Sequence, residues 1–238
     1  MSPSNYEVRV TSASDFEVRA MPTGFQFRGY AAVFNALSED LGGFVEQIAR
    51  GAFAKTIQEA DVRALWNHDP NFVLGRNKAG TLRMWEDTHG LGYEVDAPDT
   101  QAARDLAVSM ERGDVDQSSF GFSTVADDWN LTERDYPLRT LLEVRLFDVS
   151  PVTFPAYEAA SSGVAIRSAA KHFGVDPTDI TDLRALIKGE DPETRTESTQ
   201  SDQSQDAPGD AHATDISAMR RLIEAKNLPA DITQKLGR

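Results

Sequence analysis

The chain has no cysteine among its 238 residues. Disulfide bonds, catalysis by a thiol and zinc sites with cysteine ligands are therefore excluded, which fits a reducing compartment. The sequence also lacks any apolar run near the roughly 20 residues of a membrane-spanning helix. Its N-terminus has neither the basic nor the apolar region of a signal peptide. We expect a soluble protein of the cytosol that does not contact a membrane.

Basic side chains are scarce as well, because 24 Lys and Arg stand against 38 Asp and Glu and give a formal net charge of −14. Binding to nucleic acid without regard to sequence depends on basic side chains that neutralise phosphates, so no nucleic-acid partner is expected. The hydrophobic share of 40% is enough to build a core. A chain of this length can hold one sizeable domain and a tail, or two small domains.

The composition changes sharply after about Lys188. Residues 190–215 contain eight acidic residues, one basic residue and no aromatic residue. Such a segment cannot bury enough apolar surface to offset the entropy of ordering it. We therefore predict a folded domain over residues 1–170, a helical extension over 171–189, a disordered acidic linker over 190–214, and a tail over 215–238 with a short amphipathic helix at 215–226.

Alternation of apolar and polar residues dominates the first two thirds of the chain, and this period of two is typical of half-buried β-strands. Polar turn residues separate the alternating segments, most clearly at Asp87-Thr88-His89-Gly90, which indicates a hairpin. Gly29 interrupts one segment and suggests a bulge or a close approach of backbone. Strands are expected over residues 7–10, 16–19, 25–34, 44–48, 61–66, 81–86, 91–97, 115–125 and 141–152.

Two segments have helical periodicity instead. Residues 51–59 place Phe53 and Ile57 on one face. The other helix begins after Thr100, a good N-cap residue, and ends before Gly113, which stands where a C′ residue belongs. Its apolar stripe consists of Ala103, Leu106, Ala107 and Met110.

Three short stretches carry side chains that can perform catalysis. Asn67-His68-Asp69-Pro70 offers a base, Ser118-Ser119-Phe120-Gly121-Phe122 a nucleophile, and Phe147-Asp148-Val149-Ser150 an acid. A His, a Ser and a carboxylate are what acyl transfer needs when cysteine is absent. Their spacing is not that of the familiar serine-hydrolase signatures, so each stretch also has a structural explanation.

His68 follows Trp66 by two residues, so in a strand both side chains point to the same face (they have the same parity). Pro70, two residues later, is expected to end the strand. Imidazole is the natural general base near neutral pH. The alternative is a structural histidine that forms a hydrogen bond at a strand end.

Asp148 shares the parity of Val144 and Leu146, so the pattern places it on an apolar face. A carboxylate there is costly unless it is paired or hydrogen-bonded. The alternative is that the strand ends at Phe147 and that Asp148 meets solvent or caps a turn.

Ser119 has the parity opposite to Phe120 and Phe122, on the side of an antiparallel sheet that ordinarily faces solvent. Gly121 on the same side is expected to let a substrate backbone come close. The alternative is an ordinary serine-rich strand face.

Taken together, these stretches resemble the prohead (capsid maturation) proteases of tailed bacteriophages. The similarity runs from about Gly29 to about Tyr157, and the order and spacing of its motifs are specific. The motifs are Gly29-Tyr30-Ala31-Ala32-Val33-Phe34, Gly51-Ala52-Phe53, Asn67-His68-Asp69, Gly90-Leu91, Ser119-Phe120-Gly121-Phe122 and Asp148-Val149-Ser150-Pro151-Val152-Thr153-Phe154-Pro155-Ala156-Tyr157.

The resemblance implies a serine endopeptidase related in fold to the herpesvirus assembly proteases. The implied fold is α+β, mainly an antiparallel β-barrel flanked by a few helices. The family's His falls on His68, its Ser on Ser119, and its third position, usually Glu, on Asp148. Glu143 is a fallback for the third position, as is His89 if that member is a His, as in the herpesvirus enzymes.

The resemblance also implies a function. The substrates are a scaffold protein or the scaffold-like N-terminal segment of the major capsid protein. They are cut inside the assembling procapsid, in the cytoplasm of the bacterial host. Self-cleavage is expected, with the acidic linker as an obvious place, and a homo-oligomer is suggested by analogy with the herpesvirus relatives. No cofactor and no metal ion are implied.

Two other functions remain open at this point. One is a non-enzymatic assembly module that binds scaffold in the procapsid through the acidic tail and terminal helix. The other is a metal-dependent hydrolase that uses His68, Asp69 and His89, although nothing in the sequence matches a metal-site signature such as H-E-x-x-H.

Overall fold

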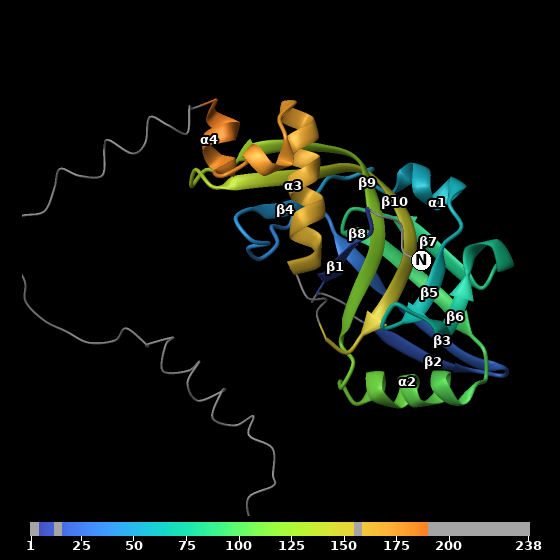
Figure 1. Cartoon of the computed structure of the whole chain (residues 1–238). Coiled ribbons are helices and arrows are strands. Elements are labelled where there is room, and N and C mark those ends of the chain that lie inside the picture. Colours follow the sequence, from blue (N-terminus) through green and yellow to red (C-terminus); the bar gives the residue numbers. More distant parts are fainter. Residues whose placement is uncertain (1–4, 12–15, 155–158, 190–238) are drawn as a thin grey trace, which may run out of the picture. The chain divides into compact units, whose positions relative to one another are not determined.

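The computed structural model describes residues 5–11, 16–154 and 159–189 (Figure 1). These residues all belong to one compact unit, Met1–Arg195. The predicted acidic linker (190–214) and the tail with its amphipathic helix (215–238) lie outside the described residues. No helix in the described part of the chain is long and apolar enough to span a membrane.

Strands dominate the described residues, as the alternating pattern predicts, and each of the expected strands is present. One strand was missed, because Pro70 was expected to end the strand before it and instead lies in a strand of its own. The strands are β1 (Glu7–Thr11), β2 (Glu17–Met21), β3 (Gly24–Val33), β4 (Val45–Ile48), β5 (Arg63–Trp66), β6 (Asp69–Arg76), β7 (Leu82–Glu86), β8 (Gly90–Ala97), β9 (Gln117–Leu131) and β10 (Pro137–Val152).

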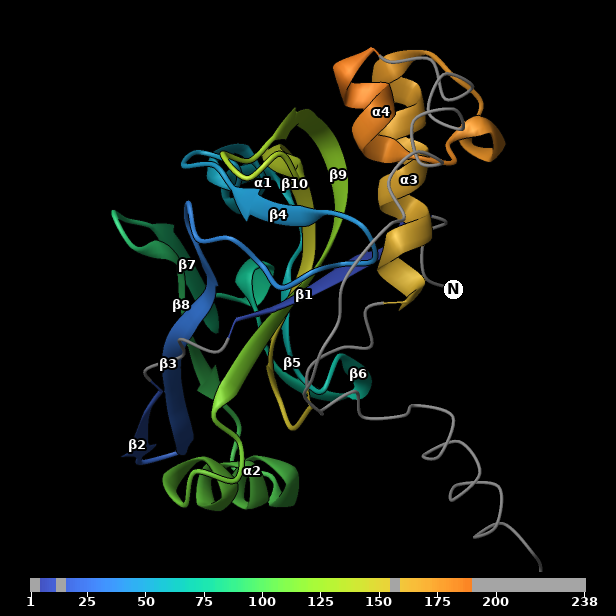
Figure 2. The same cartoon turned by 90° about the vertical axis from the view of Figure 1, so that its left-hand side faces the viewer.

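The helices are short and lie at the margins of the sheets (Figures 1 and 2). Thr100 caps α2 as predicted, since its Oγ1 accepts a hydrogen bond from the Ala103 amide. Gly113 follows that helix with φ of 78°, a conformation that favours glycine. The helices are α1 (Ala54–Glu59), α2 (Gln101–Glu111), α3 (Ala159–Phe173) and α4 (Leu183–Lys188), with 3₁₀ turns η1 (Asn77–Ala79) and η2 (Pro177–Asp179).

The strands form two separate sheets. One contains six strands in the order β1-β9-β10-β5-β6, with β4 also paired to β10, and the other has the order β2-β3-β8-β7. All pairings are antiparallel except those of β4 and β5 with β10. The mixed α+β class is therefore confirmed.

The prediction of a β-barrel is wrong, because the strands form no closed barrel in the described part of the chain. No strand pair joins the two sheets within the described residues. The larger sheet has the edge strands β1, β4 and β6, and the smaller one has β2 and β7. The sheets are held together by apolar side chains instead of a continuous hydrogen-bonded ladder. Among the most deeply buried of these are Phe27, Leu91, Tyr93, Phe120 and Phe122, each at most 1% exposed.

A second apolar cluster joins the helices α3 and α4 to the larger sheet. Phe44 and Trp129 pack with their ring centroids 5.2 Å apart. Ala165 and Ala169 of α3 and Leu183 of α4 complete this cluster. The small alanine side chains let α3 lie close to β9.

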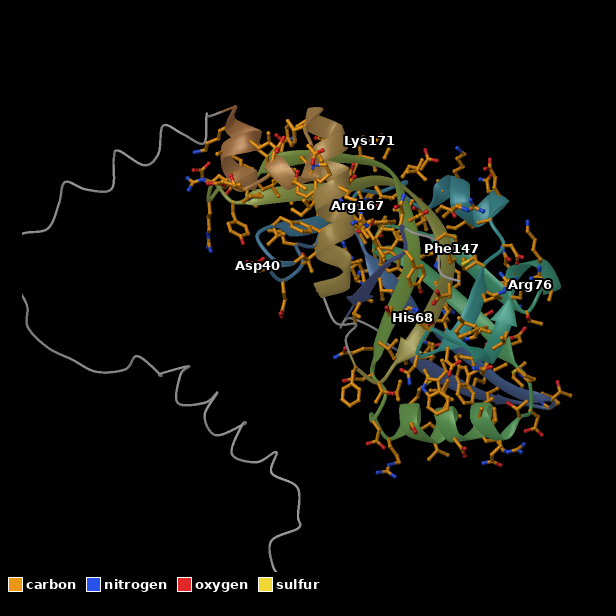
Figure 3. All side chains as sticks on the ribbon, in the orientation of Figure 1. Asp40, His68, Arg76, Phe147, Arg167 and Lys171 are labelled. Carbon is orange, nitrogen blue, oxygen red and sulfur yellow. The ribbon has the colours of Figure 1, made fainter. Side chains whose placement is uncertain are left out.

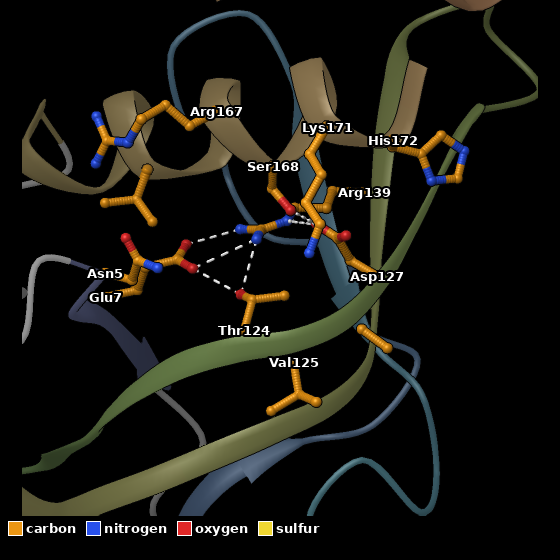
Figure 4. Close-up of a pocket in the computed structure, with 12 residues that line it drawn as sticks. Asn5, Glu7, Thr124, Val125, Asp127, Arg139, Arg167, Ser168, Lys171 and His172 are labelled. Carbon is orange, nitrogen blue, oxygen red and sulfur yellow. Dashed lines mark hydrogen bonds and ion pairs between the residues drawn. The ribbon is translucent and has the colours of Figure 1, made fainter. Parts of the chain in front are cut away.

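A buried group of charged side chains lies between β1, β9, β10 and α3 (Figure 4). Arg139 donates to Glu7 at 2.7 Å, to Glu46 at 3.0 Å and to Asp127 at 2.7 Å. Arg9 binds Glu46 with two hydrogen bonds of 2.7 and 2.9 Å. Burial opposes the charge of Arg139, but the charges of Glu46 and Glu7 outweigh it and raise the pKa of that guanidinium.

We expect Arg139→Met to destabilise the protein by about 3–5 kcal/mol, because three buried carboxylates then lose a positive partner. Urea unfolding measures this loss. Arg83→Met is the matched control, since the Arg83 side chain is 44% exposed and pairs with Glu94 and Asp96 at the surface, where such pairs contribute less than about 1 kcal/mol. Equal effects of the two changes would contradict the role given to Arg139.

Candidate active site

Ser119 lies in the middle of the larger sheet, between two paired strands. It is opposite Val10 of β1 and opposite Ser150 of β10. Its side chain has the parity opposite to the core residues Phe120 and Phe122, as the sequence predicts. The expectation that this side faces solvent is wrong, because Ser119 is 0% exposed.

His68 lies in the tight turn between β5 and β6. Trp66 and Asp69 are paired across this turn, so Asn67 and His68 are its two central residues. Both have positive φ, 56° and 57°, as a type I′ hairpin turn requires, and Asn and His tolerate this conformation better than most residues. His68 is thus held in a rigid turn, not at the end of a strand before Pro70.

Asn67 fastens this turn to the end of β10. Its backbone amide donates to the Pro151 carbonyl at 3.0 Å. Its side-chain oxygen accepts from the Thr153 amide at 2.8 Å, and its side-chain nitrogen donates to Thr153 Oγ1 at 3.2 Å. These contacts place the neighbouring imidazole over β10 (Figure 3).

Asp148 reaches the same side of the sheet through a β-bulge. The register of β10 against β9 shifts between Leu146 and Asp148, so that Leu146 pairs with Phe122 and Asp148 with Gly121. The extra residue, Phe147, reverses the parity. Asp148 therefore does not share the apolar face of Leu146, as the strict alternation predicted, but lies on the face of Ser119.

The three predicted residues meet in one hydrogen-bonded chain. His68 Nδ1 is 2.5 Å from Asp148 Oδ1, and His68 Nε2 is 2.7 Å from Ser119 Oγ. A carboxylate only accepts hydrogen bonds, so Nδ1 carries a proton and Nε2 of the neutral ring keeps a lone pair toward the serine. This is the relative placement that a base between a nucleophile and an orienting acid requires.

Asp148 is held by two further hydroxyl groups. Ser150 Oγ donates to Oδ1 at 2.7 Å and Tyr6 OH donates to Oδ2 at 2.9 Å. Burial and the negative charge of Asp148 raise the pKa of Tyr6, so its hydroxyl stays protonated and remains a donor. The Asp148 side chain is 6% exposed, and these donors compensate for its loss of water.

Gly121 makes room for this arrangement. A Cβ atom at this position would lie 2.2 Å from Tyr6 OH and 2.4 Å from Asp148 Oδ2. The sequence suggested that Gly121 would admit a substrate backbone, but the space beside it is filled by these two side chains.

We expect Gly121→Ala to displace Asp148 from His68, lower kcat/KM by more than about tenfold and destabilise the fold by about 1–3 kcal/mol. Gly163→Ala is the matched control, because a Cβ there meets nothing closer than Arg167 at 3.7 Å and alanine favours the helix. Steady-state kinetics and thermal unfolding of both variants test this. Unchanged activity of Gly121→Ala would show that the packing around Asp148 does not matter for its role.

The two fallback candidates for the third position lie elsewhere. Glu143 forms an exposed ion pair with Lys55 at 3.1 Å, and His89 packs against the ring of Tyr30 in the turn before β8. His68, Asp69 and His89 do not converge. Among the residues that the structure describes, no three or more His, Asp or Glu side chains are placed to hold a metal ion.

Sequence reasoning missed Tyr6, Asn67 and Ser150 as parts of the site. Tyr6 directly precedes β1 and Ser150 lies in β10, and alternation alone does not show which strands these two pair with. The turn at Asn67 could have been predicted, because Asn and His between two strand-like segments tolerate the positive φ angles of a tight hairpin turn.

The sequence and the structure are similar to those of known proteins. The model of the caudovirus prohead serine protease family matches residues 14–173. The prohead protease of Enterobacteria phage HK97 is 31% identical over an alignment of 158 residues. The alignment covers 64% of this chain and 66% of that protein's length, just under two thirds. The bacteriophage T4 capsid assembly protease, gp21, aligns with a TM-score of 0.40 and 12% identity over 63% of this chain and 99% of that one.

Proposed function

The chain belongs to the caudovirus prohead serine protease family, and from this premise we propose that it is a serine endopeptidase of phage capsid maturation. The observation that carries the proposal is the contact of one imidazole, His68, with both Ser119 and Asp148. An assembly module without activity has no need for such a buried polar chain.

The proposed mechanism is acyl transfer. His68 Nε2 takes the proton of Ser119 as Oγ attacks the carbonyl carbon of the substrate peptide bond. The same proton then goes to the leaving amine, and water releases the acyl group in a second round. Asp148 keeps the proton on Nδ1 and stabilises the imidazolium that forms. Ser150 and Asn67 are positioning residues that act through Asp148 and His68.

The proposed substrates are capsid proteins, either a separate scaffold protein or the scaffold-like N-terminal segment of the major capsid protein. Cleavage takes place within the assembling procapsid, in the cytoplasm of the bacterial host. We also propose self-cleavage in the acidic linker (190–214), which joins the protease domain (1–170) and helical extension (171–189) to the tail (215–238). We further propose that the fold is related to that of the herpesvirus assembly proteases and that the protein forms a homo-oligomer.

Co-expression with the phage's capsid and scaffold proteins tests this function. The wild-type chain should shorten one of them, with new termini that mass spectrometry can map, while the Ser119→Ala chain leaves them intact. If both chains support capsid assembly equally and no cut is found, the non-enzymatic assembly module is the better description. Cleavage that strong chelators abolish would instead favour a metal-dependent hydrolase.

A further inference from the structure

The proposed nucleophile is covered by the chain's own first strand. Ser119 Oγ donates a hydrogen bond to the Arg9 carbonyl oxygen at 2.9 Å, and the residue is 0% exposed. A hydroxyl has one proton, so Ser119 cannot donate to Arg9 and to His68 at the same time. While β1 is in place, Ser119 is not accessible to another polypeptide.

β1 is an edge strand, so it can leave the sheet without separating any other pair of strands. It is five residues long and lies at the sheet edge, paired only with β9, whereas β9 and β10 are central. Its Val10 lies opposite Ser119 and its Val8 opposite Gly121, so the face that β1 turns toward the triad carries aliphatic side chains. The preceding Tyr6 reaches Asp148 from the same face.

We propose, on the basis of the proposed function, that β1 occupies the place of the substrate strand. A substrate then displaces β1 and pairs with β9 as an extended segment in which an acidic residue precedes a basic residue by two positions. Adding a strand to a sheet edge is a common way to bind peptides, with the main chain giving affinity and alternate side chains giving specificity.

The expected charge pattern of the substrate follows from Arg139 and Glu46, the two side chains that bind β1 and stay in place when β1 leaves. Glu7 meets Arg139, and Arg9 meets Glu46, each through two hydrogen bonds. Arg139 is 0% and Glu46 3% exposed. Without β1, Arg139 keeps Glu46 and Asp127 as partners, but it loses Glu7, and Glu46 loses Arg9. A substrate strand that carries an acidic and a basic residue in the same order restores both contacts.

A pocket between β9 and α3 receives the acidic side chain. It has a volume of about 480 Å³ and is lined by Glu7, Thr124 and Arg139, together with Arg167 and Lys171 of α3 (Figure 4). When Glu7 leaves, Asp127 is the one carboxylate in this lining, against Arg139, Arg167 and Lys171, so the pocket favours an acidic group. Arg139 and Glu46 are therefore the specificity-determining residues of this proposal.

The register also identifies the bond that is cut. The carbonyl closest to Ser119 Oγ is that of Arg9, so a substrate in the same register presents the carbonyl of its basic residue. Oγ bonds to that carbon, the bond to the next nitrogen breaks, and the proton from Oγ reaches the leaving amine through His68. Cleavage is thus expected directly after the basic residue of a substrate segment that consists of an acidic residue, any residue and a basic residue, in that order.

Two peptides test the charge pattern on the wild-type full-length chain. One has the sequence of residues 5–11, and in the other the Glu and the Arg are exchanged, so that composition and net charge are identical. We expect kcat/KM to be at least about tenfold higher for the first, with the cut between Arg and Val. Equal rates, a preference for the exchanged peptide, or a cut at another bond overturns the proposal.

A disulfide that locks β1 tests its displacement. Thr11 and Ser118 are directly opposite each other, and Cα atoms of paired strands lie within disulfide range. The chain has no other cysteine, so Thr11→Cys combined with Ser118→Cys gives one defined bond. Its formation is read from the intact mass.

The rate at which a fluorophosphonate labels Ser119 should fall by about tenfold or more on oxidation and return on reduction with dithiothreitol. Equal labelling of the oxidised and reduced forms shows that β1 need not move and overturns the proposal. If the wild-type chain cuts its protein substrate but neither peptide, the substrate assignment alone is wrong. If the wild-type chain cuts no protein substrate, the proposed function itself has failed.

Discussion

Replacing Ser119 by alanine should lower kcat for peptide-bond cleavage by roughly 10⁶-fold, which in practice means below detection. In the proposed mechanism the acyl-enzyme bond forms on Oγ of Ser119, and among the described residues no other hydroxyl contacts His68 Nε2. Ser150 Oγ donates to Asp148 Oδ1. Cleavage of a quenched fluorescent substrate by purified protein measures the loss.

The folded state should survive this change. Ser119→Ala removes the contacts of Oγ with the Arg9 carbonyl and with His68 Nε2, a loss of about 1–2 kcal/mol. Ser123→Ala is the matched control, because Ser123 belongs to the same strand, opposite Arg145 and away from the triad. Wild-type rates in Ser119→Ala, or equal losses in both variants, would rule out Ser119 as the nucleophile.

Asp148→Asn should lower kcat by roughly 10⁴-fold while leaving the fold intact. An amide can turn its NH₂ group toward His68 Nδ1, which then becomes the acceptor. The ring proton moves to Nε2, and the imidazole can no longer take the proton of Ser119. The carboxylate is therefore required for the tautomer of His68 as well as for its charge.

Asp69→Asn is the matched control for this prediction. Asp69 is next to His68 in sequence, but its Oδ1 accepts hydrogen bonds from the backbone and side chain of Asn71. Its replacement should change kcat only slightly. If Asp69→Asn costs as much as Asp148→Asn, Asp148 has no special role. Asp148→Glu, which keeps the charge, should recover part of the activity lost in Asp148→Asn.

The sequence allowed the strands to be predicted, because alternation is a local signal. The choice of His68, Ser119 and Asp148 as site residues came from the resemblance to the prohead proteases, and it stays a prediction that their mutual contacts support. The sequence could not show how these residues reach one another. Asp148 reaches the correct face only because Phe147 forms a bulge, and a period of two cannot reveal an extra residue. The bulge also brings the shorter acid, Asp instead of the usual Glu, within 2.5 Å of the imidazole.

The role of the first strand was likewise not predictable. Residues 7–10 were expected to form an ordinary half-buried strand, and their pattern contains nothing that specifies β9 as the partner. Only long-range pairing puts Arg9 against Ser119 and Tyr6 against Asp148. The prediction of a barrel was wrong for a related reason, because closure of a sheet depends on how its edge strands meet and not on their local sequence pattern.

The most direct measurement is the position at which a fluorophosphonate reacts with the full-length protein. Our account predicts one adduct, on Ser119, whose formation parallels the loss of cleavage activity and which is not formed in His68→Ala. Tandem mass spectrometry of the labelled protein locates the modified residue. An adduct on another serine, or full loss of activity with Ser119 unmodified, would contradict the assignment of His68, Ser119 and Asp148 as the catalytic residues.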